Sequence, residues 1–176
     1  HIRFKENDAK QQQLSLGYMG VNLIYGAFYQ NDKPKKILKY LFDHIDSDAI
    51  EIDTINFQGP LFKDIDNRVL SLELVKLGMT DAVMFGPDGN NLLPAAELYR
   101  KNIIALRGRF RPVTIVNEDM YKQSLLIFQN ESENDDDETL VIFEMTLSNL
   151  KQTGEIDEKD FMDRARLLCS LGHTVM

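Results

Sequence analysis

Three apolar segments, each followed by a polar or glycine-rich turn, most constrain the fold of this chain. They cover residues 49–57, 81–85 and 102–106, and helix-like sequence separates them. Strands that alternate with helices in this way are typical of parallel βαβ units, in which ligands bind outside the carboxyl ends of the strands. The sequence therefore predicts an α/β domain of three layers. It would be Rossmann-like, with a mainly parallel sheet and helices on both of its faces.

Amphipathic stretches with helix start and stop residues predict the helices of this domain. Pro34 follows a capping Asp or Asn, so a helix begins there and runs to about Ile45. The segment 67–77 is capped by Asp64 or Asp66 and ends before Gly78, which suits a left-handed C-terminal residue. Further helices are expected at 94–100, 117–128 and 157–171.

The amino-terminal part of the chain is harder to assign. Residues 1–15 are mostly polar and predict a frayed lead-in, which leaves 16–176 as a single domain. The segment 16–29 is apolar with three glycines and fits a buried strand or a helix equally well. Because the sequence starts at His1 and stops at Met176, we expect a segment of a longer protein.

Composition narrows the classes of partner. A formal charge of -8 argues against general binding of nucleic acid or anionic membranes, which requires clustered Lys and Arg. No apolar run approaches the ~18–20 residues of a membrane span. Cys169 is the only cysteine, so an internal disulfide is excluded and a cytoplasmic setting is expected.

The strongest local signal is a run of arginines at the end of the third strand. Arg107, Arg109 and Arg111 would share one side of an extended chain, and Gly108 would let a ligand approach the backbone. Guanidinium groups hold phosphate or carboxylate through paired hydrogen bonds. The run therefore predicts an anion site. The alternative is that these arginines pair with the protein's own carboxylates.

Polar residues at the other strand ends are further candidates. Asn67 and Arg68 open a helix, whose amino terminus can bind anions, although Asp66 can satisfy the same N–H groups by capping. Asp88 belongs to a Gly-Pro-Asp-Gly turn and is expected to serve this turn alone. The alternative is that it holds a metal ion or a ribose hydroxyl.

One polar series lies along the first strand itself. Asp53, Asn56 and Gln58 are expected to point to one side of this strand, as ligand contacts or as ties between neighbouring loops.

Other polar residues favour structural roles. The acidic run from Glu131 to Glu138 predicts a solvated loop, because the ligand spacing of a calcium loop is missing. Glu144 lies within an apolar strand and is expected to pair with an arginine, with a general base as the alternative. His173 and Cys169 are expected to be structural. No grouping has the spacing of metal ligands, so we expect no zinc site.

The chain also resembles a group of longer bacterial proteins in six segments: 17–22, 56–60, 66–68, 79–89, 107–114 and 171–175. Those proteins bear the labels nicotinate-nucleotide adenylyltransferase or TonB-dependent receptor. The resemblance implies an inner segment of a larger protein. The alternation of strands with helices does not fit the barrel of a TonB-dependent receptor. The His-x-Gly-His motif of the adenylyltransferases is represented only by Gly172-His173, so neither label assigns a catalytic residue.

These observations predict a domain that binds a phosphorylated or nucleotide-like small molecule. Its reaction class, by family label only, is nucleotidyl or phosphoryl transfer, and Mg²⁺ with a nucleotide would be the matching cofactor. The alternatives are a ligand-sensing module without chemistry and a protein-interaction scaffold. The catalytic residues and the oligomeric state are left open.

Overall fold

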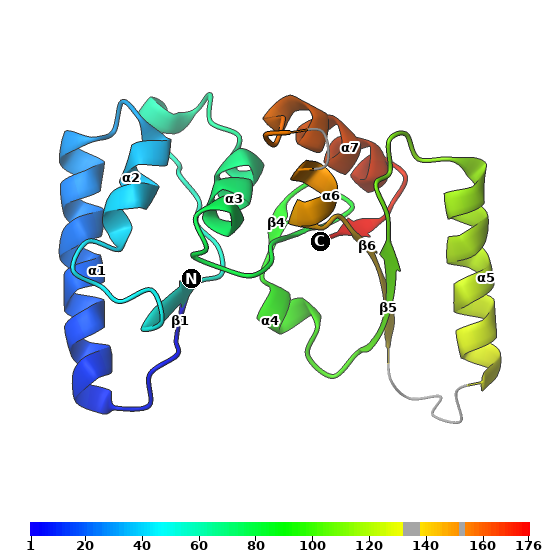
Figure 1. The fold of residues 1–176 in the computed structure, drawn as a ribbon, viewed down its shortest axis with the longest axis horizontal. Helices are drawn as coiled ribbons and strands as arrows, with labels where there is room; N and C mark the ends of the chain where they lie inside the picture. Colours follow the sequence, from blue (N-terminus) through cyan, green and yellow to red (C-terminus); the bar gives the residue numbers. More distant parts are fainter. Residues whose placement is uncertain (132–137, 152–153) are drawn as a thin grey trace. The chain divides into compact units, whose positions relative to one another are not determined.

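A computed structural model describes residues 1–131, 138–151 and 154–176 (Figure 1). The chain divides into two compact units, unit 1 at residues 1–83 and unit 2 at 84–176. The single domain predicted at 16–176 stays a prediction. The first of the three expected strands pairs with the amino-terminal segment, while the other two belong to a second sheet.

Unit 1 begins with a two-stranded antiparallel sheet. β1 (Ile2–Phe4) pairs with β2 (Ile50–Ile52), so that Ile2 lies opposite Ile52. Residues 1–15 are therefore not a frayed lead-in: they form β1 and the first turns of the following helix. The expectation was wrong because the pairing partner of β1 lies about fifty residues away and leaves no local signal.

The segment left open between strand and helix is helical. α1 (Ala9–Tyr29) starts at Asp8, whose carboxylate accepts the N–H of Gln11 at 2.9 Å. α1 packs beside α2 (Pro34–Leu41), which begins at the predicted proline (Figure 1). A side chain at Gly26 would put its Cβ 2.8 Å from Cγ2 of Ile37, so this glycine permits the close approach of the two helices.

A short 3₁₀ turn, η1 (Pro60–Phe62), and α3 (Asn67–Lys76) complete unit 1. The predictions for α3 are confirmed: Asp66 caps it through the N–H of Arg68, and Gly78 follows it with φ of 70°. The apolar core of unit 1 is one contiguous cluster of side chains from α1, α2, β2, α3 and the segments that connect them: Met19, Ile37, Leu38, Leu41, Ile45, Ala49, Ile50, Ile52, Leu70, Leu74 and Met79.

Unit 2 contains a mixed five-stranded sheet in the order β4-β3-β7-β6-β5. β5 (Asn102–Arg107), β6 (Thr139–Glu144) and β7 (Thr174–Val175) are parallel. β3 (Met84–Phe85) runs antiparallel to β7 and to β4 (Asn91–Leu92). The α/β class is confirmed, whereas the strands of 50–111 do not form one parallel series. The turn at Gly86 to Gly89 makes a hairpin, with the N–H of Gly86 bound to the carbonyl of Asn90 at 2.9 Å, and so reverses the chain.

The helices of unit 2 are α4 (Pro94–Glu97), α5 (Ile115–Glu131), α6 (Leu147–Lys151) and α7 (Glu158–Ser170). α7 starts at the predicted cap Asp157 and buries Phe161, Ala165, Leu168 and Cys169, as expected for the cysteine. The polar sequence at 149–155 predicts a turn, and α6 occupies residues 149–151 of it. The acidic loop falls mainly at 132–137, outside the described residues. None of the helices in the described segments is both long and apolar enough to span a membrane.

Candidate functional site

The arginine loop (residues 107–111) is largely neutralised by carboxylates of unit 2. Arg107, the last residue of β5, lies opposite Glu144 of β6 and binds its carboxylate through two nitrogen atoms of the guanidinium group. Nε lies 2.8 Å from Oε2, and Nη2 lies 3.0 Å from Oε1. The hydrogen bond to Glu144, followed by its charge, raises the pKa of Arg107. The arginine partner expected for Glu144 is confirmed.

The other two arginines lie beyond the end of β5. The strand ends at Arg107, and Phe110 has φ of 48°, so the alternation of an extended chain is lost. Arg111 Nε lies 3.2 Å from Asp160 Oδ1, and Arg164 binds the same carboxylate while donating to the carbonyl of Arg109 at 3.0 Å. The extended strand on which the prediction of three arginines on one side rested therefore ends at Arg107, and the shared side stays a prediction.

Gly108 also has a different role from the one expected. A Cβ on Gly108 would lie 2.9 Å from Cε1 and Cζ of Phe110, whose ring is buried and packs on Phe143 at 5.2 Å between centroids. The glycine therefore makes room for an aromatic ring of the protein itself.

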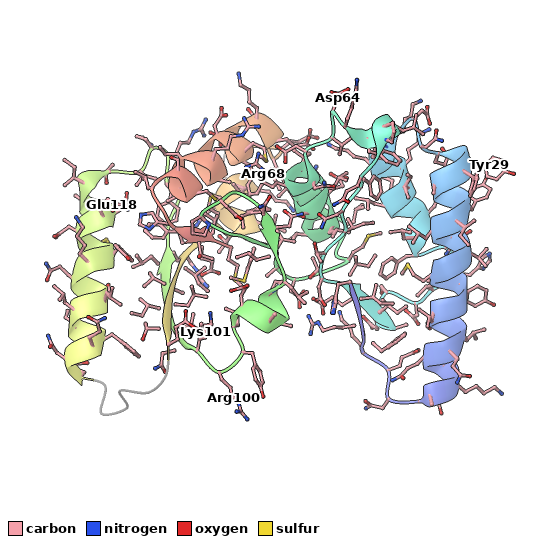
Figure 2. All side chains as sticks on the ribbon, turned by 180° about the vertical axis from the view of Figure 1, so that it is seen from behind. Tyr29, Asp64, Arg68, Arg100, Lys101 and Glu118 are labelled. Atoms are coloured by element: carbon pink, nitrogen blue, oxygen red, sulfur yellow. The ribbon has the colours of Figure 1, made fainter. Side chains whose placement is uncertain are left out.

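At the start of α3, the candidate anion contacts serve as caps and ties. Asp66 accepts the Nε and Nη2 groups of Arg68 at 2.9 and 2.8 Å, which gives the cation at this helix terminus an anionic partner (Figure 2). Asn67 accepts the N–H of Phe57 at 2.8 Å and donates to its carbonyl at 3.3 Å. These bonds attach the segment after β2 to α3.

Asp88 and Asp53 likewise have partners within the protein. Asp88 accepts the N–H of Asn90 at 3.0 Å, and this bond is the main reason that the pKa of Asp88 is lowered. Asp53 is buried and accepts Arg3 Nε at 2.7 Å and His1 Nδ1 at 2.9 Å. The geometry supports the turn interpretation of Asp88 and the tying interpretation of Asp53.

His173 in unit 2 has a structural setting. Its Nε2 lies 2.7 Å from Oε1 of Glu118, which projects from the first turn of α5 (Figure 2). The imidazole is buried and stacks on Phe143 at 4.2 Å, with Tyr121 at its edge. Since Glu118 belongs to a helix far away in sequence, sequence analysis had no signal for this pair.

The pocket with the clearest binding geometry lies within unit 1. It has a volume of about 310 Å³ and lies between α1, α2, the start of β1 and residues 54–62. Most of its walls are apolar, and its lining consists of His1, Ile2, Met19, Leu23, Ala27, Ile37, Leu41, Thr54, Ile55, Asn56, Phe57, Gln58 and Phe62. Two residues predicted as strand-end contacts, Asn56 and Gln58, therefore line a cavity. Asp53, from the same predicted series, is not among the lining residues.

Thr54 is the lining residue that sequence analysis missed. Its Oγ1 atom is buried and has no hydrogen-bond partner in the described parts of the chain. A buried hydroxyl normally finds a partner, because leaving it unpaired costs about 1–3 kcal/mol. Thr54 therefore lines the pocket and carries a hydroxyl whose hydrogen-bonding capacity no described residue uses.

The charge of the pocket wall limits the chemistry of that ligand. Among the described residues that line it, His1 has the only ionisable side chain. The terminal ammonium of His1 already donates to the carbonyl of Thr54 at 2.8 Å, so an anion in this mostly apolar cavity would find few donors to offset its loss of hydration. The pocket therefore suits a neutral, mostly apolar molecule better than a phosphate.

Comparison with known proteins found no matching family model, no matching curated protein and no matching solved structure. Within the described ranges, no group of three or more His, Cys, Asp or Glu side chains is arranged to hold a metal ion. The function is therefore inferred from the geometry of each unit.

Proposed function

We propose that unit 1 is a non-catalytic binding module for a small, neutral and mostly apolar molecule that carries a hydrogen-bond acceptor. The observation that carries this proposal is a buried, unpartnered hydroxyl in the wall of an apolar cavity, as far as the described residues extend. A volume of about 310 Å³ lies at the lower end of the roughly 300–1,000 Å³ typical of small-molecule sites.

Each part of the pocket has a separate role in this binding. The apolar side chains of α1 and α2 remove the ligand from water, which contributes roughly 25 cal/mol per Å² of apolar surface buried. Thr54 Oγ1 donates a hydrogen bond to the acceptor and so fixes the orientation of the ligand. Asn56 and Gln58 follow it along the wall.

A phosphorylated or nucleotide-like ligand of unit 2 is the second candidate, and Arg109 is the observation that favours it. Its exposed side chain follows β5 and makes no ion pair within the described residues. A transferase activity with Mg²⁺ and a nucleotide, and a three-layer Rossmann-like arrangement around β5, β6 and β7, belong to this candidate.

Thermal melting followed by circular dichroism tests both candidates. We expect 2-octanone to raise the melting temperature more than octane, because only the ketone offers an acceptor to Thr54. The Thr54→Val variant keeps the shape of the side chain and should remove the advantage of the ketone, a loss of roughly 3- to 10-fold in affinity. Thr139→Val, in β6 of unit 2, is the matched control and should keep it.

A blocking variant separates pocket binding from surface binding. Ala27 lines the pocket but is exposed, so Ala27→Trp should occlude the cavity without disturbing the core and abolish the effect of both probes. A ketone effect that survives this change would reject the pocket. Stabilisation by ATP with Mg²⁺ that is lost in Arg109→Gln would instead favour the second candidate.

A further inference from the structure

α1 carries an apolar stripe with the spacing of a helix-pairing seam. Leu14, Tyr18, Val21, Tyr25 and Phe28 follow one another at intervals of four and three residues, and they are 53%, 41%, 66%, 48% and 75% exposed. Successive steps of this kind place side chains in one line along a helix and form the seam of paired helices. The buried residues of α1 lie on a different side of the helix: Ser15, Met19 and Gly26.

The stripe also lacks charge. No Asp, Glu, Lys or Arg occurs from Gln11 to Tyr29, although 27% of the whole chain is charged. The outer face of a helix in a soluble domain normally carries charged and polar side chains. The surface of α1 therefore suits an equally apolar and uncharged partner.

We infer that this partner is α1 of a second copy of the chain, packed antiparallel about a two-fold axis at Val21. Such a pair places Leu14 opposite Phe28 and Tyr25 opposite Gly17. A Cβ at Gly17 would meet nothing within 4 Å, so the glycine leaves space for the tyrosine ring. Large side chains thus face small or apolar ones, as a self-complementary two-fold interface requires.

The charges at the two ends of α1 fit the same arrangement. Lys10, in the first turn, is the only charged residue of α1, and Asp32 follows shortly after the helix ends. In the antiparallel pair, each Lys10 approaches the partner's segment that contains Asp32, whose carboxylate also lies 4.0 Å from Nζ of Lys33 in its own chain. A parallel pair would bring Lys10 to Lys10, and like charges at close range are unfavourable.

The size of the stripe agrees with a reversible dimer. With roughly 200 Å² for an aromatic side chain and somewhat less for an aliphatic one, the exposed fractions amount to roughly 500 Å² per copy. Two copies would bury roughly 1,000 Å², about the area that a specific interface is expected to clear.

Sedimentation equilibrium on the whole chain tests the dimer. We expect the wild type to dimerise and Val21→Glu to be monomeric, with a dissociation constant raised by about 100-fold, because two carboxylates would meet at the axis. Val21→Lys should also be monomeric, because two ammonium groups would meet at the axis. An equimolar mixture of the two variants should form a heterodimer, because a carboxylate would then meet an ammonium group. Leu16→Glu is the matched control: Leu16 is 50% exposed on the same helix but lies off the stripe, so this variant should still dimerise.

Cysteine cross-linking tests the direction of the helices. Under oxidation, a mixture of Leu14→Cys and Phe28→Cys chains should give a mixed disulfide dimer, whereas Leu14→Cys alone should cross-link poorly; Cys169 is buried and should not interfere. A monomeric wild type, equal effects of Val21→Glu and Leu16→Glu, or preferential cross-linking of two Leu14→Cys chains to each other would overturn the proposal.

Discussion

The pocket of unit 1 and the arginine loop of unit 2 differ in how the protein satisfies their polar groups. In the loop, Arg107 and Arg111 each bind a carboxylate of the same unit. In the pocket, the buried hydroxyl of Thr54 has no partner among the described residues. Two of the more conspicuous residues in the sequence are therefore used internally, whereas the less conspicuous Thr54 has no hydrogen-bond partner for its hydroxyl among the described residues.

The comparison shows why charge is a weak guide to binding in an acidic chain. The chain has 28 Asp and Glu against 20 Lys and Arg. An arginine therefore meets a carboxylate of its own protein more readily than it would in a chain with an excess of basic residues. An unpaired neutral group in an apolar cavity has no such internal competitor, so it carries more information about a ligand.

The largest effect is expected in the arginine loop, from a change that adds one methyl group. Gly108→Ala should destabilise the protein by about 2 kcal/mol, because its Cβ would press on the buried ring of Phe110. Urea unfolding measures this change. Gly20→Ala is the control: a Cβ there meets nothing within 4 Å, so the helix should be stabilised by up to ~1 kcal/mol. A Gly108→Ala protein as stable as the wild type would leave room for the ligand role of this glycine.

How much the sequence could predict depended on how local the signal was. The caps Asp66 and Asp157 and the glycine after α3 lie next to the helices that they delimit, and all were predictable. β1 was not, because it is defined by pairing with β2 at a distance. The direction of β3 depends on the hairpin that joins it to β4. The turn residues of this hairpin were recognised in the sequence, but the reversal of the chain that they cause was not predicted.

The candidate site was predictable only in part. The pairing of Glu144 with an arginine followed from the cost of burying a lone charge in a strand. The pocket did not follow from local sequence, because α1, α2 and residues 54–62 meet only after folding. Nothing in the sequence around Thr54 distinguishes its hydroxyl from that of any other threonine of the chain.

A second, smaller effect concerns the stability of the ligand-free protein. Thr54→Val should stabilise it by about 1 kcal/mol, because the variant keeps the shape of the side chain and removes an unsatisfied buried hydroxyl. Urea unfolding without ligand measures this change, and Thr80→Val provides the contrast. Thr80 is buried and donates to Glu51 at 2.8 Å, so its variant should be less stable than the wild type. If both variants lost stability, Thr54 would have a partner within the protein.

The smallest expected effect concerns Asp88, which either completes a turn or holds a metal ion. The N–H and the side chain of Asn90 both bind its carboxylate, and they lower its pKa from 3.8. Because the pKa is lowered on folding, the stabilisation is present above pH 3.8 and is lost as the pH falls through the lower value of the folded state. A carboxyl titration by NMR should therefore find a depressed pKa that Asn90→Ala moves part of the way back, since the backbone bond remains. Millimolar Mg²⁺ should leave the titration unchanged. A further depression by Mg²⁺ would instead assign Asp88 to a metal, and the contrast between the internally paired residues of unit 2 and the pocket proposed in unit 1 would then be weaker.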